Sequence, residues 1–376
     1  MFAANSCWNI VNFRRPLLKA LSTAGYRLLV VAPADAYSPQ LAALGAAFVP
    51  IDLKSSGLSP LADARLTARF ARLLRVHRPA ALLGFTIKPN IYASLAARGT
   101  DIAVINNISG LGTAFLRPGP LQRLVSTLYR AALGRSVAVF FHNPDDRDLF
   151  VGRRLVRPGQ ARLLPGSGID LARFAPRRRP RSDGEGVRFL LIARMLWDKG
   201  VGEYVEAARQ LRRTHPAARF ALLGPLGADN RSAAPAAAID GWVAEGVVEY
   251  LGETDDVRPA IAAADCIVLP SYREGLPRSL IEASAMARPA IASDVPGCRH
   301  AVDDGVTGFL CAPRSAVALA EAMERMIALS PAERKKMGEA AREMATRAFD
   351  ETLVVRAYLD ALAENGVAGP LGGGDD

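Results

Sequence analysis

Cysteine is scarce in this chain of 376 residues, which contains four, at positions 7, 266, 298 and 311. They are far apart and show no paired spacing. This argues against a disulfide framework and against a zinc site built from cysteine pairs. We expect reduced, buried thiols in a cytoplasmic protein.

Long hydrophobic runs are also missing. Half of the residues are hydrophobic, but no apolar stretch approaches the roughly 18 uninterrupted residues that a membrane helix needs. Residues 1–6 contain no basic leader and become polar at Asn5. The sequence therefore predicts neither a membrane span nor a secretory signal.

Aromatic residues make up only 7% of the chain and are not interleaved with its basic clusters. The net charge of +10 alone would permit a nucleic-acid binder. Without stacking platforms or a helix-turn-helix pattern, however, we expect no nucleic-acid partner.

Apolar runs alternate with helical patterns along the whole chain, which is typical of a doubly wound α/β fold. The length suggests two domains at roughly 150 residues each. Strands are expected at 27–32, 46–51, 80–84, 103–106, 137–141 and 161–164, then at 188–193, 219–223, 247–251, 266–270, 290–293 and 308–310. Helices are expected at 60–77, 119–133, 280–287, 316–329, 331–348 and 351–364.

A segment rich in proline, glycine and arginine separates the two halves and reads as a linker. We therefore predict a first Rossmann-like domain at 1–168, a linker at 169–186 and a second Rossmann-like domain at 187–350. A terminal helix at 351–366 and a disordered, glycine-rich tail at 367–376 follow.

Residues 273–282, REGLPRSLIE, follow a predicted buried strand and lead into a helix. Glu274 stands at the end of the strand and Glu282 near the start of the helix, so both carboxylates can border one crevice. The helix N-terminus suits a phosphate, whereas carboxylates accept hydrogen bonds from sugar or ribose hydroxyls. A nucleotide-sugar carries both kinds of group.

Two cations follow another predicted strand, in the stretch ARMLWDKG at 193–200. Arg194 and Lys199 are placed to hold a diphosphate and to neutralise the charge that builds on a departing nucleoside diphosphate. Because the site supplies its own cations, we predict that it needs no metal and no other cofactor.

Together these motifs resemble a family 4 glycosyltransferase, the retaining class with the GT-B fold. Glu274 and Glu282 match its Glu-x7-Glu pattern, Arg194 and Lys199 its phosphate pair, and the segments 294–297 and 304–310 fit as well. The resemblance covers nearly the whole chain. Further segments, at 5–9, 12–14, 88–90 and 110–115, resemble a bacterial branch that extends polyprenyl-diphosphate-linked oligosaccharides.

The resemblance implies two domains facing each other across a cleft, with the last helix crossing back onto the first domain. It implies that Arg194 and Lys199 bind the diphosphate of a UDP-sugar, that Glu282 holds the ribose and that Glu274 contacts the transferred hexose or N-acetylhexosamine. The turn Gly275, Leu276 and Pro277 would bring backbone amides to the distal phosphate. The strand end at Leu251 would receive the base.

Two residues in the first half have open roles. His142 ends the strand at 137–141, where it either polarises a sugar hydroxyl or only shapes the turn at 143–144. Gly112 lies in a loop after the strand at 103–106. That loop either approaches the donor sugar or the acceptor, or is a simple tight turn.

Basic residues concentrate in the first half and the linker, which predicts attraction to anionic lipid headgroups. They are Arg14, Arg15, Lys19, Arg117, Arg123, Arg130, Arg177, Arg178, Arg179 and Arg181. We therefore expect a peripheral protein on the cytoplasmic face of the inner membrane that acts on a polyprenyl-diphosphate-linked saccharide. A genome that favours arginine over lysine would explain the same residues.

Three other functions remain open at this stage. A nucleotide-sugar epimerase or another enzyme on the same scaffold would use the same donor site. An unreactive nucleotide-binding protein would also bind the donor. A basic nucleic-acid-binding protein would exploit the charge alone.

Overall fold

The structure is a computed structural model that describes residues 1–53, 57, 59–112, 115, 119–177, 186–227, 230, 232–367 and 369. The chain divides into two compact units, Met1–Gly168 with Glu351–Asp376, and Ile169–Asp350. Both units are Rossmann-like α/β folds, as the sequence predicted.

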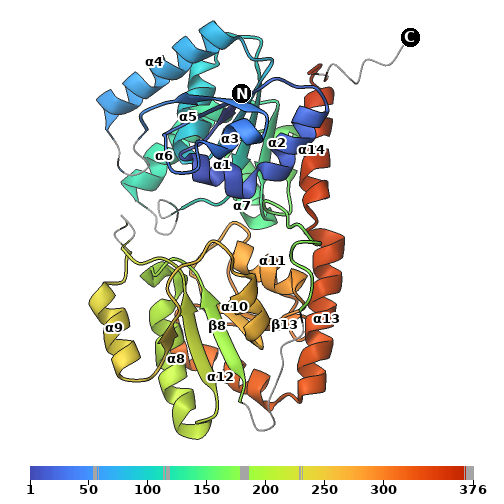
Figure 1. The fold of residues 1–376 in the computed structure, drawn as a ribbon. Coiled ribbons are helices and arrows are strands. Elements are labelled where there is room, and N and C mark those ends of the chain that lie inside the picture. Colours follow the sequence, from blue (N-terminus) through green and yellow to red (C-terminus); the bar gives the residue numbers. More distant parts are fainter. Residues whose placement is uncertain are drawn as a thin grey trace. The chain divides into compact units, whose positions relative to one another are not determined.

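The first unit, whose helices α1 to α7 and α14 are labelled in Figure 1, contains a parallel sheet in the order β3-β2-β1-β4-β5-β6-β7. Its strands are β1 Phe2–Ala3, β2 Leu28–Ala32, β3 Ala46–Pro50, β4 Ala81–Phe85, β5 Ala103–Ile108, β6 Ala138–Phe141 and β7 Ala161–Leu163. Its helices are α1 Cys7–Phe13, α2 Arg15–Thr23, α3 Gln40–Ala43, α4 Pro60–His77, α5 Ile87–Ala96, α6 Pro120–Leu133, α7 Pro144–Gly152, η2 Pro158–Gln160 and α14 Glu351–Ala363.

Hydrophobic side chains cover both faces of this sheet, as a parallel sheet requires. One core joins strand residues to α1, α2 and α14, and the other joins them to α4, α5, α6 and α7. The C-terminal helix α14 contributes Val354, Tyr358, Ala361 and Leu362 to the first of these cores. It is therefore part of the first unit although it is last in the chain.

The second unit contains a parallel sheet in the order β10-β9-β8-β11-β12-β13. Its strands are β8 Arg188–Ile192, β9 Arg219–Leu223, β10 Glu249–Tyr250, β11 Cys266–Leu269, β12 Ala290–Ser293 and β13 Gly308–Cys311. Its helices are η3 Trp197–Lys199, α8 Val201–Thr214, α9 Ala236–Ala244, α10 Arg258–Ala263, α11 Arg278–Ala285, α12 Ala316–Ala328 and α13 Pro331–Ala348.

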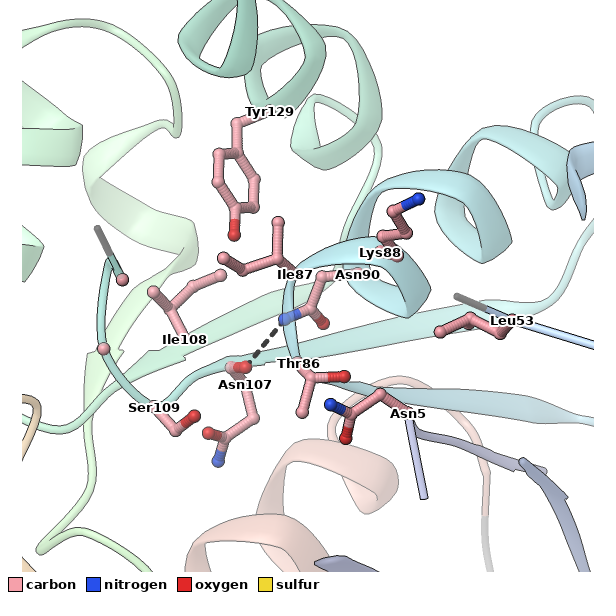
Figure 2. Close-up of a pocket in the computed structure, with 12 residues that line it drawn as sticks. Asn5, Leu53, Thr86, Ile87, Lys88, Asn90, Asn107, Ile108, Ser109 and Tyr129 are labelled. Carbon is pink, nitrogen blue, oxygen red and sulfur yellow. Dashed lines mark hydrogen bonds between the residues drawn. The ribbon is translucent and has the colours of Figure 1, made fainter. Parts of the chain in front are cut away.

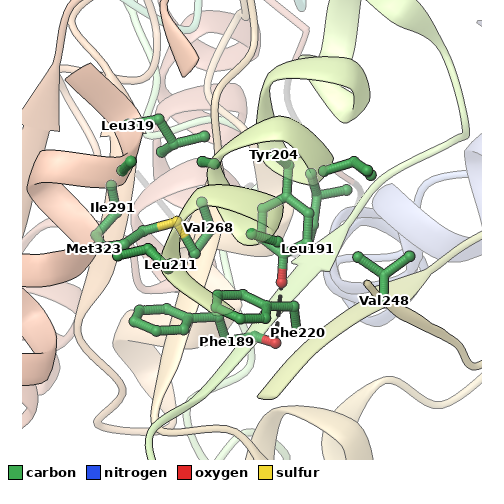
Figure 3. Packing of buried hydrophobic residues seen from close by; sticks show 14 of the residues in the cluster. Phe189, Leu191, Tyr204, Leu211, Phe220, Val248, Val268, Ile291, Leu319 and Met323 are labelled. Carbon is green, nitrogen blue, oxygen red and sulfur yellow. Dashed lines mark hydrogen bonds between the residues drawn. The ribbon is translucent and has the colours of Figure 1, made fainter. Parts of the chain in front are cut away.

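Aromatic side chains anchor one core of the second unit (Figure 3). The rings of Phe189 and Phe220 stack at 5.6 Å between centroids, and Tyr204 from α8 packs beside them. The hydroxyl of Tyr204 donates to the carbonyl oxygen of Phe189 at 3.1 Å. This packing fixes α8 on the sheet and so fixes the loop that precedes it.

The expected linker differs from the structure in one part. Ile169 and Phe174 are buried in a core of the second unit, and the amide of Ile169 donates to the carbonyl oxygen of Phe349. Residues 169–177 therefore pack as part of that unit, whereas 178–185 lie outside the described residues. The apolar side chains at 169 and 174 are the physical reason, because they bury surface that a free linker would expose.

In both sheets the strand order reverses next to the first strand, which creates a crevice at the carboxyl ends of two neighbouring strands. In the first unit the reversal lies between β1 and β4, and in the second between β8 and β11. Ligands of open α/β sheets bind at such positions. Residues that bind a ligand are therefore expected to lie at these two crevices.

Candidate active site

In the second unit, the loops after β8 and β11 are packed directly against each other. Gly200 has a φ of +75°, and a Cβ atom there would lie 2.2 Å from the carbonyl oxygen of Pro270. The amide of Tyr272 donates to the carbonyl oxygen of Asp198 at 3.0 Å. A glycine is thus required at 200 for the two loops to meet.

This packing brings together two of the predicted site residues. Lys199 Nζ forms an ion pair with Glu274 Oε1, and Ser271 Oγ donates to the same carboxylate oxygen at 2.7 Å. The side chains of Lys199 and Glu274 are 21% and 14% exposed, so the pair is largely but not fully shielded from water. A cation and a carboxylate therefore lie side by side at the ends of two neighbouring strands.

Helix α11 begins immediately after this pair. Pro277 occupies the N-cap position and has no side chain that could accept a hydrogen bond from the helix amides. Gly275 and Pro277 are buried in the turn and Leu276 is half-buried. The turn thus presents a helix N-terminus beside Lys199, the arrangement that favours an anion.

Glu282 lies one turn further along α11 and is only 7% exposed. Its Oε1 accepts a hydrogen bond from Arg278 Nε at 2.7 Å, in an ion pair within the same helix. Burial raises the pKa of the Glu282 carboxyl, while Arg278 and then Arg173 lower it. Glu282 is thus paired within its own helix, with a residue that the sequence did not single out.

Arg194 and Leu251 are both exposed. Arg194 follows β8, where Gly224 approaches the backbone so closely that a Cβ atom there would lie 2.0 Å from the carbonyl oxygen of Ala193. Within the described residues the Arg194 side chain forms no hydrogen bond or ion pair. Leu251 follows β10, and its amide donates to the carbonyl oxygen of Leu222 at 2.8 Å.

His142 directly follows β6 and is 7% exposed. Burial, together with the nearby charge of Arg14, lowers the pKa of His142 to about 3. The imidazole is therefore neutral at physiological pH, and this pKa is far from the value near 7 that suits a general base. Its Nε2 is buried without a hydrogen-bond partner in the described part of the chain.

A pocket with a volume of about 230 Å³ lies in the first unit, at the crevice between β1, β4 and β5 (Figure 2). Residues from three motif segments of the sequence meet in it. Asn5 follows β1, Lys88 and Asn90 lie at the start of α5, and Gly110 and Gly112 follow β5. Gly112 is thus a lining residue of this pocket.

Hydrogen bonds of buried asparagine side chains fix the residues that line the pocket. Asn90 Nδ2 donates to the carbonyl oxygen of Asn107 at 2.8 Å, and Asn107 Nδ2 donates to the hydroxyl of Tyr358 at 2.9 Å. Asn106 adds bonds to Asn90 Oδ1 and Ser94 Oγ. Because Tyr358 belongs to α14, this hydrogen bond links the C-terminal helix to Asn107, which lines the pocket.

The prediction of a basic surface on the first half of the chain is wrong for Arg14. Arg14 is only 3% exposed and its guanidinium lies 4.7 Å from the centroid of the Phe85 ring, so it faces the interior. The reason is that Arg14 separates α1 from α2, whose apolar faces turn inward. Lys19, Arg123 and Arg130 are exposed, whereas Arg117, Arg178, Arg179 and Arg181 lie outside the described residues.

The described residues offer neither a membrane span nor a cluster of metal-ligating side chains. None of the helices combines the length with the hydrophobicity needed to cross a bilayer. In the same part of the chain, no three side chains of His, Cys, Asp or Glu are grouped as metal ligands.

Sequence reasoning missed Arg278, Ser271 and Tyr129. Arg278 lies within the motif 273–282 and Ser271 lies three residues before Glu274, so their proximity in the sequence was available as a signal. Tyr129 lies within an amphipathic helix, where an aromatic residue is expected to belong to the core. Nothing in the local pattern distinguishes it.

Two protein-family descriptions match this chain. "Glycosyl transferase 4-like domain" matches residues 10–167, and "Glycosyl transferases group 1" matches residues 186–328. The first match lies in the first unit and the second lies in the unit that contains Lys199 and Glu274.

Similar curated proteins transfer sugars. One is N,N'-diacetylbacillosaminyl-diphospho-undecaprenol alpha-1,3-N-acetylgalactosaminyltransferase of Campylobacter jejuni, 26% identical over 95% of this chain and 96% of its own length. Another is glycogen synthase of Mycobacterium tuberculosis, 33% identical over 55% of this chain and 50% of its own length.

Similar solved structures share the fold over almost the whole length. Anabaena Alr3699/HepE in complex with UDP and glucose has a TM-score of 0.75, with 18% identity over 96% of this chain and 98% of that one. WaaG, a glycosyltransferase involved in lipopolysaccharide biosynthesis, has a TM-score of 0.70, with 18% identity over 96% and 98%.

Proposed function

Because this chain belongs to the family 4 glycosyltransferases with the GT-B fold, we propose that it transfers a hexose or N-acetylhexosamine from a UDP-sugar to a polyprenyl-diphosphate-linked saccharide, with retention. The acceptor is supported by the undecaprenol-linked substrate in the name of the Campylobacter jejuni relative. UDP is supported by the complex of the Anabaena structure. The product would serve cell-surface polysaccharide synthesis.

The observation that carries this proposal is the contact between Lys199 and Glu274 at the N-terminus of α11. It puts a cation, a carboxylate and a helix N-terminus at the crevice where α/β sheets bind ligands. Lys199 and the exposed Arg194 bind the diphosphate, and Glu274 accepts hydrogen bonds from the sugar being transferred. Glu282 holds the ribose, and the strand end at Leu251 receives the base.

Retention, which the family resemblance implies, sets the course of the proposed reaction. The bond between the anomeric carbon and the β-phosphate oxygen breaks, and a bond from the acceptor hydroxyl oxygen forms on the same face of the sugar. The proton of that hydroxyl passes to the departing phosphate, whose charge Lys199 and Arg194 stabilise. Glu274 orients the sugar and does not attack it, and the first unit holds the acceptor.

His142 is neutral at physiological pH and only a weak base, since its pKa is about 3. We assign it a hydrogen-bonding role at the end of β6 and not that of a base. The cations of the site also make a divalent metal unnecessary in this scheme, so we expect turnover to persist in the presence of EDTA.

The testing experiment incubates the purified protein with a panel of nucleotide-sugars and a polyprenyl-diphosphate-linked saccharide, and identifies products by mass and anomeric configuration by NMR. We expect release of UDP only when the acceptor is present. Conversion of the donor alone would instead indicate an epimerase, and an inverted product would remove the assignment of retention.

Lys199→Ala and Glu274→Ala should each abolish transfer while the protein stays folded, as judged by circular dichroism. Lys335→Ala is the matched control, because Lys335 forms a comparable ion pair with Glu339 on the exposed surface of α13. Undiminished turnover of both site variants would refute the roles assigned to these residues.

A further inference from the structure

The pocket of the first unit has a chemistry of its own, distinct from that of the donor site. Among the described residues that line it, Lys88 is the only charged one. Lys88 Nζ lies 3.0 Å from Asp63 Oδ1, and the two side chains are 13% and 8% exposed. Lys199 of the proposed donor site is paired in the same way, but there the exposed Arg194 adds a second cation, whereas the described residues that line this pocket include no cation besides Lys88. The pocket is therefore less suited to a diphosphate than the donor site is.

The remaining polar groups of the pocket are amides and hydroxyls. Asn5, Thr86 and Ser109 come from the ends of three neighbouring strands and border one space (Figure 2). Such neutral donors and acceptors match the hydroxyl and acetamido groups of a sugar. The volume of about 230 Å³ is below the roughly 300–1,000 Å³ of pockets for drug-sized ligands, so one sugar ring is the expected size of occupant.

Tyr129 of α6 gives this pocket an unused hydrogen-bonding group. The residue is 1% exposed, its ring packs edge-on against Phe150 at 5.2 Å, and its hydroxyl points toward the pocket (Figure 2). Within the described part of the chain this hydroxyl has no hydrogen-bond partner. Burial, with a smaller contribution from Asp146, raises the pKa of Tyr129, so the hydroxyl stays protonated.

Two other fully buried tyrosines show that this is unusual. The hydroxyl of Tyr204 bonds to the carbonyl of Phe189, and that of Tyr358 bonds to Asn107. A buried tyrosine hydroxyl normally finds such a partner, because leaving it without one costs free energy. The hydroxyl of Tyr129 instead opens onto the pocket and is not one of the fully buried, unpartnered polar atoms of the described residues, so a bound sugar can reach it.

We propose that this pocket binds the neutral terminal sugar of the acceptor, not its diphosphate, and that the Tyr129 hydroxyl hydrogen-bonds to that sugar. The proposal rests on the function proposed above. It places the specificity for the acceptor saccharide in the residues that follow β1, β4 and β5, together with α6.

The first test compares Tyr129→Phe with Tyr204→Phe, since each removes only one buried hydroxyl. Without ligand, Tyr204→Phe should lower the unfolding midpoint by about 2–4 °C because it breaks a bond, whereas Tyr129→Phe should leave the midpoint unchanged. Tyr129→Phe should raise KM for the acceptor about fivefold to tenfold, with UDP binding unaltered. Tyr204→Phe should leave KM for the acceptor unchanged.

The second test separates sugar from diphosphate with two soluble probes, a short alkyl glycoside of an N-acetylhexosamine and inorganic pyrophosphate. We expect the glycoside to compete with the acceptor and to lose affinity in Tyr129→Phe, while pyrophosphate acts equally on both proteins. Competition by pyrophosphate that depends on Tyr129 would overturn the proposal, as would a Tyr129→Phe variant that loses stability and keeps its KM.

Saturation-transfer NMR of the glycoside with the enzyme distinguishes this inference from the proposed function. Binding that Tyr129→Phe weakens would support the pocket even if no donor of the panel were transferred. Active transfer with no binding of the glycoside would instead refute the pocket assignment alone.

Discussion

Arg278 occupies a position in α11 that local energetics do not explain. A cation in the first turn of a helix opposes the helix dipole, and an arginine four residues before a glutamate is the less favourable order for an ion pair. Nevertheless Arg278 Nε lies 2.7 Å from the buried Oε1 of Glu282. A role in keeping Glu282 ionised and oriented toward the ribose would account for it.

Replacing Arg278 by methionine should therefore make nucleotide binding sensitive to acid. Burial raises the pKa of Glu282, and Arg278 is the largest influence that lowers it, ahead of Arg173, while Asp256 raises it further. In Arg278→Met the carboxyl would protonate at a higher pH than in the wild type. UDP affinity, measured by calorimetry between pH 5 and 8, should then fall toward acid pH with a limiting slope of about tenfold per pH unit.

Glu282→Gln is the control for this experiment, because it removes the titrating group. It should weaken UDP binding equally at every pH. If Glu282→Gln binds UDP normally, Glu282 does not hold the ribose. If Glu282→Gln weakens UDP binding but Arg278→Met leaves the pH dependence of UDP affinity as in the wild type, the role assigned to Arg278 is wrong. The role assigned to Glu282 then stands.

His142 should make the stability of the protein depend on pH. Its pKa is about 3 in the folded protein against 6.5 for an ordinary histidine, so below pH 6.5 the unfolded chain binds a proton that the folded chain does not. The free energy of unfolding should fall as pH decreases from 6.5 toward 3, by at most about 1.4 kcal/mol per pH unit. In His142→Asn, urea denaturation at several pH values should show a flatter dependence.

The exposed His77 on α4 provides the matched control for this measurement. His77→Asn should leave the pH dependence as it is in the wild type. A wild-type dependence in His142→Asn would show that another group is responsible. Loss of transfer in that variant at neutral pH would also restore a direct role for His142.

At the scale of single residues, the sequence indicated which side chains are candidates for the site, but not which side chains contact one another. The order of strands and charges predicted Lys199, Glu274 and Glu282, and the structure joins the first two directly. The sequence alone could not show that Arg278 pairs with Glu282 or that Arg14 is buried, because both depend on which face of a short helix turns inward.

At the scale of elements, the apolar runs located the strands well. β9, β12, α4 and α13 have the expected bounds, and the other predicted elements differ by one or two residues at one or both ends. Helix α5 was missed because it is buried between its neighbours α4 and α6 and therefore lacks a polar face. Helices α1 and α2 were missed because each is short and they are separated only by Arg14.

The contact between the loops after β8 and β11 depends on Gly200. In Gly200→Ala the new Cβ would collide with the carbonyl of Pro270, and φ of +75° is itself unfavourable for alanine. We expect the loops to separate, so Lys199 would leave Glu274. Donor-dependent transfer should fall to background, with a lower unfolding midpoint by differential scanning fluorimetry.

Gly246→Ala separates this effect from backbone strain. Gly246 has a φ of +74° but no atom within 4 Å of a Cβ built there, so it carries only the conformational cost of about 1–2 kcal/mol. It should lose some stability and keep full turnover. Equal loss of activity in both variants would mean that destabilisation, and not loop contact, explains the result.

At the scale of the whole molecule, the two units repeat one design with different chemistry. Each has a parallel sheet with a reversal beside its first strand, and each places polar residues there. The second unit gathers charged side chains at its reversal, whereas the first gathers mainly neutral amides and hydroxyls around one ion-paired lysine. Repetition of apolar strands predicted the architecture, but only the side chains at the strand ends give the two crevices different chemistry.

The net charge of +10 and the surface of α6 suggest how the first unit would reach a lipid-linked acceptor. Leu121 and Leu124 are each 48% exposed and Arg123 between them is exposed too. Leucines beside a cation are the composition of a helix that lies on an anionic bilayer. We therefore expect the protein to float with anionic vesicles at low salt and to detach as salt screens the charge.

Changing both leucines to serine isolates the apolar part of this attraction from the electrostatic part. Leu121→Ser with Leu124→Ser should reduce the floated fraction at low salt, because the remaining charge gives weaker attachment than charge and apolar burial together. Val317→Ser on α12, which removes a 57% exposed apolar side chain from the other unit, should not. If the leucine variant floats as well as the wild type, α6 is not the contact; if no protein floats at any salt concentration, the positive charge reflects arginine-rich composition and not a membrane partner.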